Sequence, residues 1–350
     1  MNKRIDYLDI AKGIGILFVV LGHNHIKQEY PLVYDVVYSF HMPFFFLLSG
    51  MFFKQEYSFL ELTRRRFNSL LKPFIVYLVI VYTASIFFTK IDLPTIFGRI
   101  PKALYAGPNT LEWVPLWFLP HLFLVNVFAF VLVKLIYERL PWLWLRLILL
   151  AGMFGLGAAT LKLFWPVNYP FFGRSFEFYG LPWSADLLLI TTAFFLLGYE
   201  MRRSFLDNLS VQRYSLWILL TAAGLFVGLH IAFKSTTDFY IRGYEPVIVS
   251  TLKAISGSVL ILYLARWFEK GPAPVVNVLK YLGTASIVLL IFHYVPQEFL
   301  YPKLVAMGLN VVLASAVSFC AGVLLPILLF AWVIHPNKWL SSWFGLSPKA

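Results

Sequence analysis

The amino-acid sequence predicts an all-α fold, a polytopic bundle of about ten transmembrane helices with both termini in the cytoplasm. The first observation behind this prediction is composition, because 60% of the 350 residues are hydrophobic and only 13% are charged. Soluble domains carry roughly a quarter charged residues. The second is that the apolar residues form stretches long enough to cross hydrocarbon. Each stretch must satisfy its own backbone hydrogen bonds there, which predicts helices.

The expected spans can be read along the chain in order. The first contains Asp9 and Lys12 and lacks a small-residue cleavage site, so it is interpreted as a retained span and not as a signal peptide. Segments expected on the inner side hold most of the Lys and Arg residues between spans, which places both ends inside. A single domain over 1–350 without an appended soluble domain is expected. The spans are 8–26, 36–53, 70–89, 113–136, 141–163, 182–200, 214–233, 246–267, 279–298 and 304–334.

The net charge of +12 does not indicate nucleic acid. The basic residues form short clusters between apolar runs, the pattern that orients a membrane protein beside its lipids, and no long basic segment follows a phosphate backbone. The longest predicted loops, 90–112 and 163–181, are expected on the outer side. They are interpreted as lids or acceptor-binding edges, or equally as ordinary connectors.

The first span, "YLDIAKGIGILFVVLGHNH", carries the polar residues best suited to catalysis. Asp9, Lys12 and His23 lie close to one helix face, since eleven residues bring the chain to about 20° from its start. The rise from Lys12 to His23 is roughly 16 Å. Gly13 and Gly15 would allow another helix or a ligand to approach closely. The alternative is a structural Asp9–Lys12 pair at the inner interface.

The histidines gather towards the outer ends of the predicted helices. Imidazole titrates near neutral pH, so one histidine acting as a general base is the economical interpretation. A metal site is not expected, because the two histidines of "GHNH" point about 200° apart and no paired ligand spacing occurs on a helix face. Among the seven histidines, those expected on the outer side are His23, His25, His41, His121, His230 and His293.

Two further sets of charged residues are candidates. The segment "TRRRFNSLLKPF" places Arg64, Arg65, Arg66 and Lys72 on the inner side, as a phosphate-binding patch or as topology signals beside anionic lipid. Asp186 lies inside the sixth span, where an acid is costly. It is interpreted as orienting a histidine or holding a hydroxyl, or equally as paired with a Lys or Arg of a loop.

Five motifs occur in the order seen in the membrane-bound acyltransferase family 3, and the resemblance covers essentially the whole chain. They are "DYLDIAKGIGILFVVLGHNH", "SFHMPFFFLLSG", the basic run before "LLKPF", "WFLPHLF" and "LGTASIVLLIFH". The sequence is most similar to the fucose 4-O-acetylase-like branch, which modifies bacterial exopolysaccharides and surface glycans. The family pattern has an arginine and a histidine separated by ten residues, and here Lys12 and His23 stand at those positions. Lys12 keeps the charge but lacks the bidentate fork of arginine.

The resemblance implies transfer of an acyl group, usually acetyl, from cytoplasmic acyl-CoA to a glycan hydroxyl in a bacterial inner membrane. Acetyl-CoA is then a co-substrate, and no tightly bound cofactor is expected. His23 is the expected base, with Asp9, Lys12 and His41 as further catalytic residues and His41 as a candidate for stabilising the oxyanion. Acyl-CoA is expected at Arg64, Arg65, Arg66 and Lys72. The expected acceptor-binding or orienting residues are Asp186, Glu177, Trp117 and His293.

Two other functions compete with acyl transfer. A transporter or flippase for polysaccharide or lipid-linked sugar could use the charged first span as part of its pathway, although no inverted-repeat pattern is visible. A structural or sensory membrane protein would leave the histidine cluster unexplained.

Overall fold

A computed structural model describes residues 6–88, 90–171, 174–206, 215–235 and 237–346. The described chain is helical apart from one two-stranded hairpin, an isolated bridge and the connecting loops, which confirms the predicted fold class. It forms two compact units. Unit 1 comprises Met1–Phe53, Phe194–Phe239 and Gly243–Trp332, and unit 2 comprises Lys54–Ala193, Tyr240–Arg242 and Val333–Ala350. The assignment of 1–350 as one domain stays a prediction.

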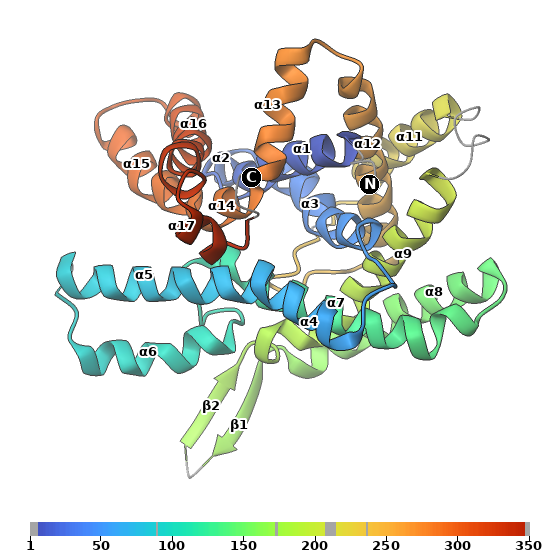
Figure 1. The fold of residues 1–350 in the computed structure, drawn as a ribbon, viewed down its shortest axis with the longest axis horizontal. Coiled ribbons are helices and arrows are strands. Elements are labelled where there is room, and N and C mark those ends of the chain that lie inside the picture. The colour runs from blue at the N-terminus through green and yellow to red at the C-terminus, as the bar shows by residue number, and fades with distance from the viewer. Residues whose placement is uncertain (1–5, 89, 172–173, 207–214, 236, 347–350) are drawn as a thin grey trace. The chain divides into compact units, whose positions relative to one another are not determined.

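Unit 1 is built around α1, which packs against α3, α12 and α13 and is surrounded by helices from both ends of the chain (Figure 1). Most of its apolar residues are buried and none is fully exposed, so the first span is the core of this unit and not a peripheral anchor. The helices are α1 (Asp6–Gly22), α2 (Ile26–Glu29), α3 (Pro31–Met51), the later part of α9 (Leu188–Leu206), α11 (Ser215–Ala232), α12 (Val247–Glu269), α13 (Ala273–Thr284), α14 (Ser286–Phe292), α15 (Tyr294–Ala306) and α16 (Val311–Leu329).

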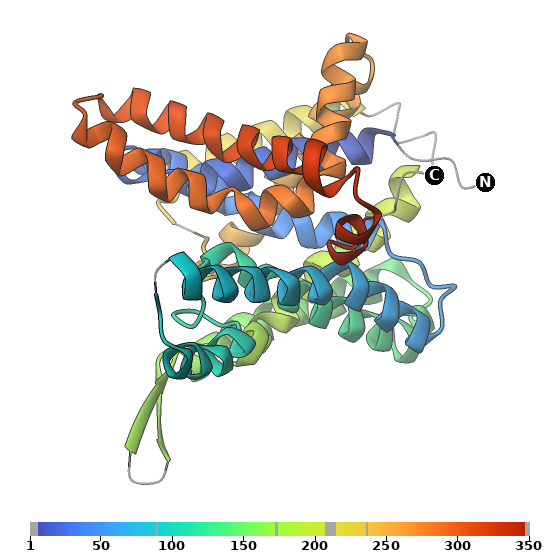
Figure 2. The same ribbon diagram turned by 60° about the vertical axis from the view of Figure 1, so that its left-hand side comes forward.

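Unit 2 contains the long helix formed by α4 and α5, which are joined through a π-helical turn, and the helices that pack beside it (Figure 2). Its elements are α4 (Phe59–Arg66), η1 (Phe67–Leu71), α5 (Lys72–Phe88), α6 (Leu93–Tyr105), η2 (Val114–Trp117), α7 (Phe118–Leu135), η3 (Tyr137–Arg139), α8 (Leu143–Leu161), η4 (Lys162–Phe164), β1 (Val167–Phe171), β2 (Arg174–Phe178), η5 (Pro182–Leu187), the start of α9 and α17 (Lys338–Trp343).

Both predicted outer loops contain regular structure that the sequence reading missed. Segment 90–112 includes the helix α6, whose Ile96 and Ala103 are buried while Leu93 and Phe97 are exposed on the neighbouring stripe. Segment 163–181 includes the antiparallel hairpin β1–β2, with Val167 opposite Phe178. Gly and Pro within these segments suggested loops, but α6 accommodates Pro101 within its helix.

Fewer helices are long and apolar enough to cross a bilayer than the ten predicted spans. Among the residues that the structure describes, seven helices meet that description, and the bent pair α13–α14, with a 62° bend, would make eight. The first predicted span falls short because α1 has only 17 residues and carries charged side chains, and the seventh because its apolar helix, Leu216–Ala232, is also short. The chain is a multi-pass membrane protein, while the number of spans and the cytoplasmic position of both ends stay predictions.

The crossing of α1 and α13 depends on two glycines at a backbone-to-backbone contact. A Cβ built on Gly13 would lie 2.0 Å from the Leu279 carbonyl oxygen, and one on Gly283 would lie 2.2 Å from the Asp9 carbonyl oxygen. At Gly15 the same atom would meet the ring of Phe44 at 2.6 Å. The close approach expected at these glycines is therefore made by neighbouring helices, the small-residue packing typical of membrane bundles.

Replacing Gly13 with alanine is expected to destabilise unit 1 by about 1–3 kcal/mol or more, because the added methyl meets a carbonyl that belongs to a helix backbone and cannot rotate away. Thermal unfolding of the purified protein in detergent measures this. Gly152→Ala is the matched control, since nothing lies within 4 Å of a Cβ there and alanine favours a helix. Equal melting temperatures for Gly13→Ala and the wild type would contradict the described contact.

Candidate functional site

His23 sits at the carboxyl end of α1, held by a last helical bond from its amide to the Val19 carbonyl oxygen at 3.2 Å. Its side chain is partly exposed. Its ring centroid lies 5.3 Å from that of His293 and 5.9 Å from that of Tyr294. His293 and Tyr294 lie at the break between α14 and α15, within the predicted ninth span. This break places an imidazole and a phenol beside the end of the predicted first span.

His293 has a defined protonation pattern. Its Nδ1 donates to the carbonyl oxygens of Leu289, at 2.8 Å, and Leu290, at 3.0 Å. A carbonyl oxygen only accepts, so Nδ1 carries the proton and the Nε2 of the neutral ring is an acceptor. The residue is fully buried, and among the described residues its Nε2 has no hydrogen-bond partner. The site therefore contains a buried imidazole lone pair beside His23.

His41 approaches the same end of α1 from α3. Its Nδ1 donates to the Val37 carbonyl oxygen at 2.8 Å, and its Nε2 would lie 3.8 Å from a Cβ built on Gly22. Tyr38, also on α3, connects this helix to α1. Its ring lies 4.8 Å from that of His41, and its hydroxyl donates to the Gly22 carbonyl oxygen at 3.1 Å. His41, His293 and Lys27 all lie close enough to His23 to interact with it electrostatically.

Lys27 supplies a cation to this region. Its ammonium donates to the Tyr38 hydroxyl at 3.1 Å and lies over the rings of Tyr34 and Tyr38. Burial lowers the pKa of Lys27 from its ordinary value, while the carboxylates of Asp238 and Glu298 act in the opposite direction. Asp238 in turn accepts a hydrogen bond from the Tyr34 hydroxyl at 2.6 Å. The tyrosines thus connect the cation to an acid of the loop before α12.

A buried amide network fixes the segment that carries His23. The Asn24 side-chain nitrogen lies 2.7 Å from Gln297 Oε1 and 3.1 Å from both the Ser315 carbonyl oxygen and Ser318 Oγ. Gln297 Nε2 donates to the Val20 carbonyl oxygen at 3.1 Å. Both amides are fully buried, so α1, α15 and α16 are locked together next to His23. The sequence reading missed this pair, although a polar Asn inside "GHNH" and a Gln after a broken apolar run were the available signals.

The other polar residues predicted in the first span are His25, Asp9 and Lys12. His25 stacks on Tyr301 with ring centroids 4.1 Å apart. Asp9 and Lys12 are partly exposed, and each has an interaction partner. The helix is continuous from Lys12 to Gly22, and His23 directly follows its last residue.

The predicted acyl-CoA residues belong to unit 2. Arg64 and Arg65 are exposed and Arg66 and Lys72 are partly exposed. Arg65 pairs with Glu61 at 2.9 Å and its guanidinium lies 4.6 Å from the Tyr57 ring centroid. Lys72 donates to Ser342 Oγ at 3.2 Å. The run ends α4, whose first turn is capped by Ser58.

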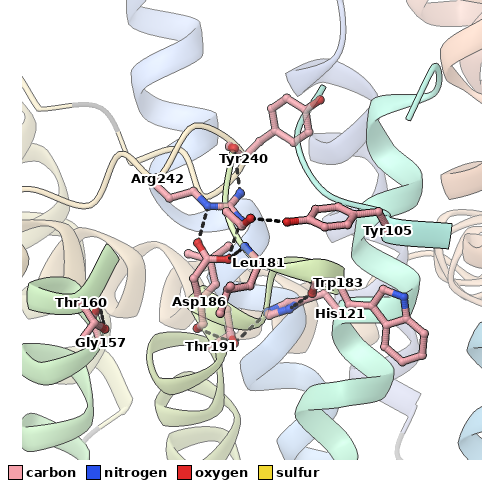
Figure 3. Close-up of polar contacts among 12 residues, drawn as sticks. Tyr105, His121, Gly157, Thr160, Leu181, Trp183, Asp186, Thr191, Tyr240 and Arg242 are labelled. Carbon is pink, nitrogen blue, oxygen red and sulfur yellow. Dashed lines mark hydrogen bonds and ion pairs between the residues drawn. The ribbon is translucent and has the colours of Figure 1, made fainter. Parts of the chain in front are cut away.

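Asp186 is paired with an arginine of a loop, one of the roles considered for it from the sequence. Arg242 donates to both carboxylate oxygens, at 2.7 and 2.8 Å, and both side chains are almost completely buried (Figure 3). Asp186 also accepts from the Leu181 amide at 2.9 Å. The pair joins the 240–242 segment to η5, where Trp183 and Ser184 have φ of 54°, a left-handed conformation that surrounding contacts must hold.

The remaining acceptor candidates also lie in unit 2. Trp117 is buried against the ring of His121, and His121 is itself saturated by the Trp183 carbonyl oxygen and Thr191 Oγ1 (Figure 3). Glu177 is exposed on β2. Of the predicted site residues, His41 and His293 are therefore brought together with His23, whereas Asp186, Glu177 and Trp117 form parts of a different unit. No group of three His, Cys, Asp or Glu side chains within the described residues is arranged to hold a metal ion.

Comparison with known proteins yields one match. A family model described as an acyltransferase domain matches residues 5–334, a range that runs through both units. No curated protein and no solved structure matches the chain.

Proposed function

This chain belongs to acyltransferase family 3, and from that membership we propose that it is a membrane-bound O-acyltransferase with His23 as its general base. The donor is cytoplasmic acyl-CoA, with acetyl as the acyl group, and the acceptor is a sugar hydroxyl of an exopolysaccharide, lipid-linked sugar or other surface glycan. The proposed location is the bacterial inner membrane. The observation that carries the proposal is the placement of His23 beside His293, His41 and Lys27 at one end of the central helix.

The chemistry needs a base, because a sugar hydroxyl is a poor nucleophile while it keeps its proton. His23 accepts that proton as the hydroxyl oxygen attacks the thioester carbonyl carbon. The tetrahedral intermediate then collapses, the carbon–sulfur bond breaks, and the coenzyme A thiolate leaves. The proton on His23 passes to the leaving sulfur, which restores the neutral imidazole for the next cycle.

The oxyanion of the intermediate needs a donor or a cation. The Nδ1 proton of His41 is already given to the Val37 carbonyl oxygen, so His41 supports an oxyanion through Nε2 only when its ring is doubly protonated. Lys27 donates through an ammonium and interacts electrostatically with both histidines. We therefore propose that Lys27, together with His41, stabilises the negative charge of the oxyanion.

The donor's phosphates are proposed to bind Arg64, Arg65, Arg66 and Lys72. Arg64 and Arg65 are exposed, and guanidinium groups suit phosphate oxygens because they offer paired donors. Coenzyme A is a co-substrate in this scheme and leaves after each turnover.

The direct test incubates membranes containing the wild-type protein with labelled acetyl-CoA and candidate glycans, and measures label on the glycan. Transfer supports the proposal. Movement of glycan across sealed vesicles without any transfer of label would instead identify the transporter and contradict acyl transfer.

The Arg64→Ala, Arg65→Ala double variant is expected to raise the KM for acyl-CoA at least about tenfold, because each charge-assisted contact to a phosphate contributes roughly 1.5–3 kcal/mol. The kcat should change little, because these residues are proposed to bind the phosphates of the donor and take no part in the proton transfer. Steady-state kinetics with varied acyl-CoA measures both constants. Lys270→Ala removes an exposed cation elsewhere and serves as the matched control. An unchanged KM would remove the basic run from donor binding.

A further inference from the structure

We infer that His293 is the positioning residue for His23: it accepts a hydrogen bond from one ring nitrogen of His23 and so leaves the other nitrogen free to act as the base. This inference rests on the proposed function, since it assigns a partner to the proposed base. It gives the site a histidine–histidine pair in which the second ring is anchored by backbone carbonyls of α14.

The first step of the argument is the anchoring of His293. Two carbonyl oxygens, of Leu289 and Leu290, receive its Nδ1 proton at 2.8 and 3.0 Å. These contacts fix the orientation of the ring and restrict the neutral form to one tautomer, in which Nε2 is a pure acceptor. An acceptor that is completely buried and unsatisfied costs free energy unless a donor reaches it.

The second step is the distance to the nearest ring. The centroids of His23 and His293 are 5.3 Å apart with the planes tilted by 51°, a separation that one N–H···N hydrogen bond between two imidazoles can bridge. No such bond is formed in this structure, because the Nε2 of His293 has no partner among the described residues. His23 is partly exposed, so a rotation of its ring is the smaller movement that would complete the bond.

The third step shows that the hydrogen bond from Nδ1 to a carbonyl oxygen of the same helix does not by itself distinguish His293. The Nδ1 of His230, on α11, also donates to the carbonyl oxygen four residues earlier, that of Phe226, at 2.7 Å, and its buried Nε2 likewise has no hydrogen bond to any residue that the structure describes. Its ring centroid lies 4.4 Å from that of Phe226, with the planes tilted by 54°. This arrangement is thus a feature of histidines in these helices, and what distinguishes His293 is the second imidazole beside it.

The pair explains how His23 can gain and lose a proton without losing its orientation. With one His23 nitrogen donating to His293 Nε2, the opposite nitrogen accepts the proton of the sugar hydroxyl. His23 is then an imidazolium whose charge is stabilised by the neutral acceptor, as in other base–orienter arrangements. When the coenzyme A thiolate leaves, the same opposite nitrogen returns the proton to sulfur, and His293 never changes its protonation.

The test compares His293→Phe, which keeps a planar ring without an acceptor, with His293→Gln, whose side-chain oxygen can accept near the position of Nε2. For His293→Phe we expect kcat to fall about 10- to 100-fold, a part of the contribution of a general base, with both KM values near wild type. His293→Gln should recover a substantial part of that loss. The double variant with His23→Ala should be no slower than His23→Ala alone, because two residues that act as one unit lose their effect together.

His230→Phe is the matched control, because it removes the same local hydrogen bond at a position without a second imidazole, and its kcat should stay at the wild-type value. Wild-type kcat in His293→Phe would overturn the inference. So would equal losses in the Phe and Gln variants together with lowered melting temperatures, which would assign His293 to packing, and so would multiplicative losses in the double variant.

A second measurement needs no turnover. In protein labelled with nitrogen-15 histidine and held in lipid nanodiscs, His293 should show a protonated Nδ1, and His23 should show one hydrogen-bonded nitrogen whose signal changes in His293→Phe. A His23 signal that is identical in the two proteins would overturn the pairing. A wild type that shows the pair but transfers no acyl group would contradict the proposed function alone.

Discussion

Alanine in place of His23 is expected to lower the kcat of acyl transfer by about 10²- to 10⁴-fold, the usual contribution of a general base. The KM values for acyl-CoA and for the glycan should stay near wild type, because the imidazole acts on a proton in the transition state and contributes little to ground-state binding. Stability should change little, since His23 is partly exposed at a helix end and the buried amides beside it stay in place. Single-turnover transfer of labelled acetyl measures the effect on chemistry directly.

The neighbouring histidine provides a matched control for this variant. His25 lies two residues further along the chain, but its ring stacks on Tyr301 and its Nε2 lies 3.2 Å from the Glu298 carboxylate. His25→Ala should therefore keep most of the wild-type kcat. If His23→Ala transferred acetyl at the wild-type rate, His23 would not be the base. If His25→Ala lost as much activity as His23→Ala, the assignment would move from one ring to the segment as a whole.

The second large effect is expected at Asp186, on stability. Asp186→Ala would leave the Arg242 guanidinium, which is only 2% exposed, without its carboxylate. Removing one partner of a buried pair typically costs about 3–5 kcal/mol, because the remaining charge is desolvated and uncompensated. The same change removes the acceptor of the Leu181 amide. A large drop in melting temperature, measured in detergent, is the expected result.

A double replacement separates charge from packing at this pair. Asp186→Leu with Arg242→Met removes both charges and should be markedly more stable than Asp186→Ala, since apolar pairs of similar volume often replace buried ion pairs without loss. Glu177→Ala, at an exposed acid, should leave stability unchanged. An Asp186→Ala variant that melted like the wild type but showed a raised KM for the glycan would instead restore the acceptor-binding role considered from the sequence.

The sequence was most informative about structure where the prediction depended on the period and length of apolar runs. It located most of the helices, because a segment in hydrocarbon must satisfy its own backbone hydrogen bonds and a helix does so. It failed at α6 and at the β1–β2 hairpin, where Gly and Pro indicated loops but contacts within unit 2 support regular structure. Ten spans were predicted, whereas seven helices of the described residues, or eight with the bent pair α13–α14, are long and apolar enough to span, so the number of spans stays a prediction.

For the candidate site, the sequence by itself determined the residue types and their helix: a histidine at the end of a polar first span that the structure confirms as a helix. The partners of that histidine were decided by tertiary structure alone. His293 lies beside it at the break between α14 and α15, and the partner of Asp186 is Arg242, which lies 56 positions away in the chain. Such contacts join residues that are distant in sequence and are selected by packing and desolvation, which no local pattern of apolar and charged residues encodes.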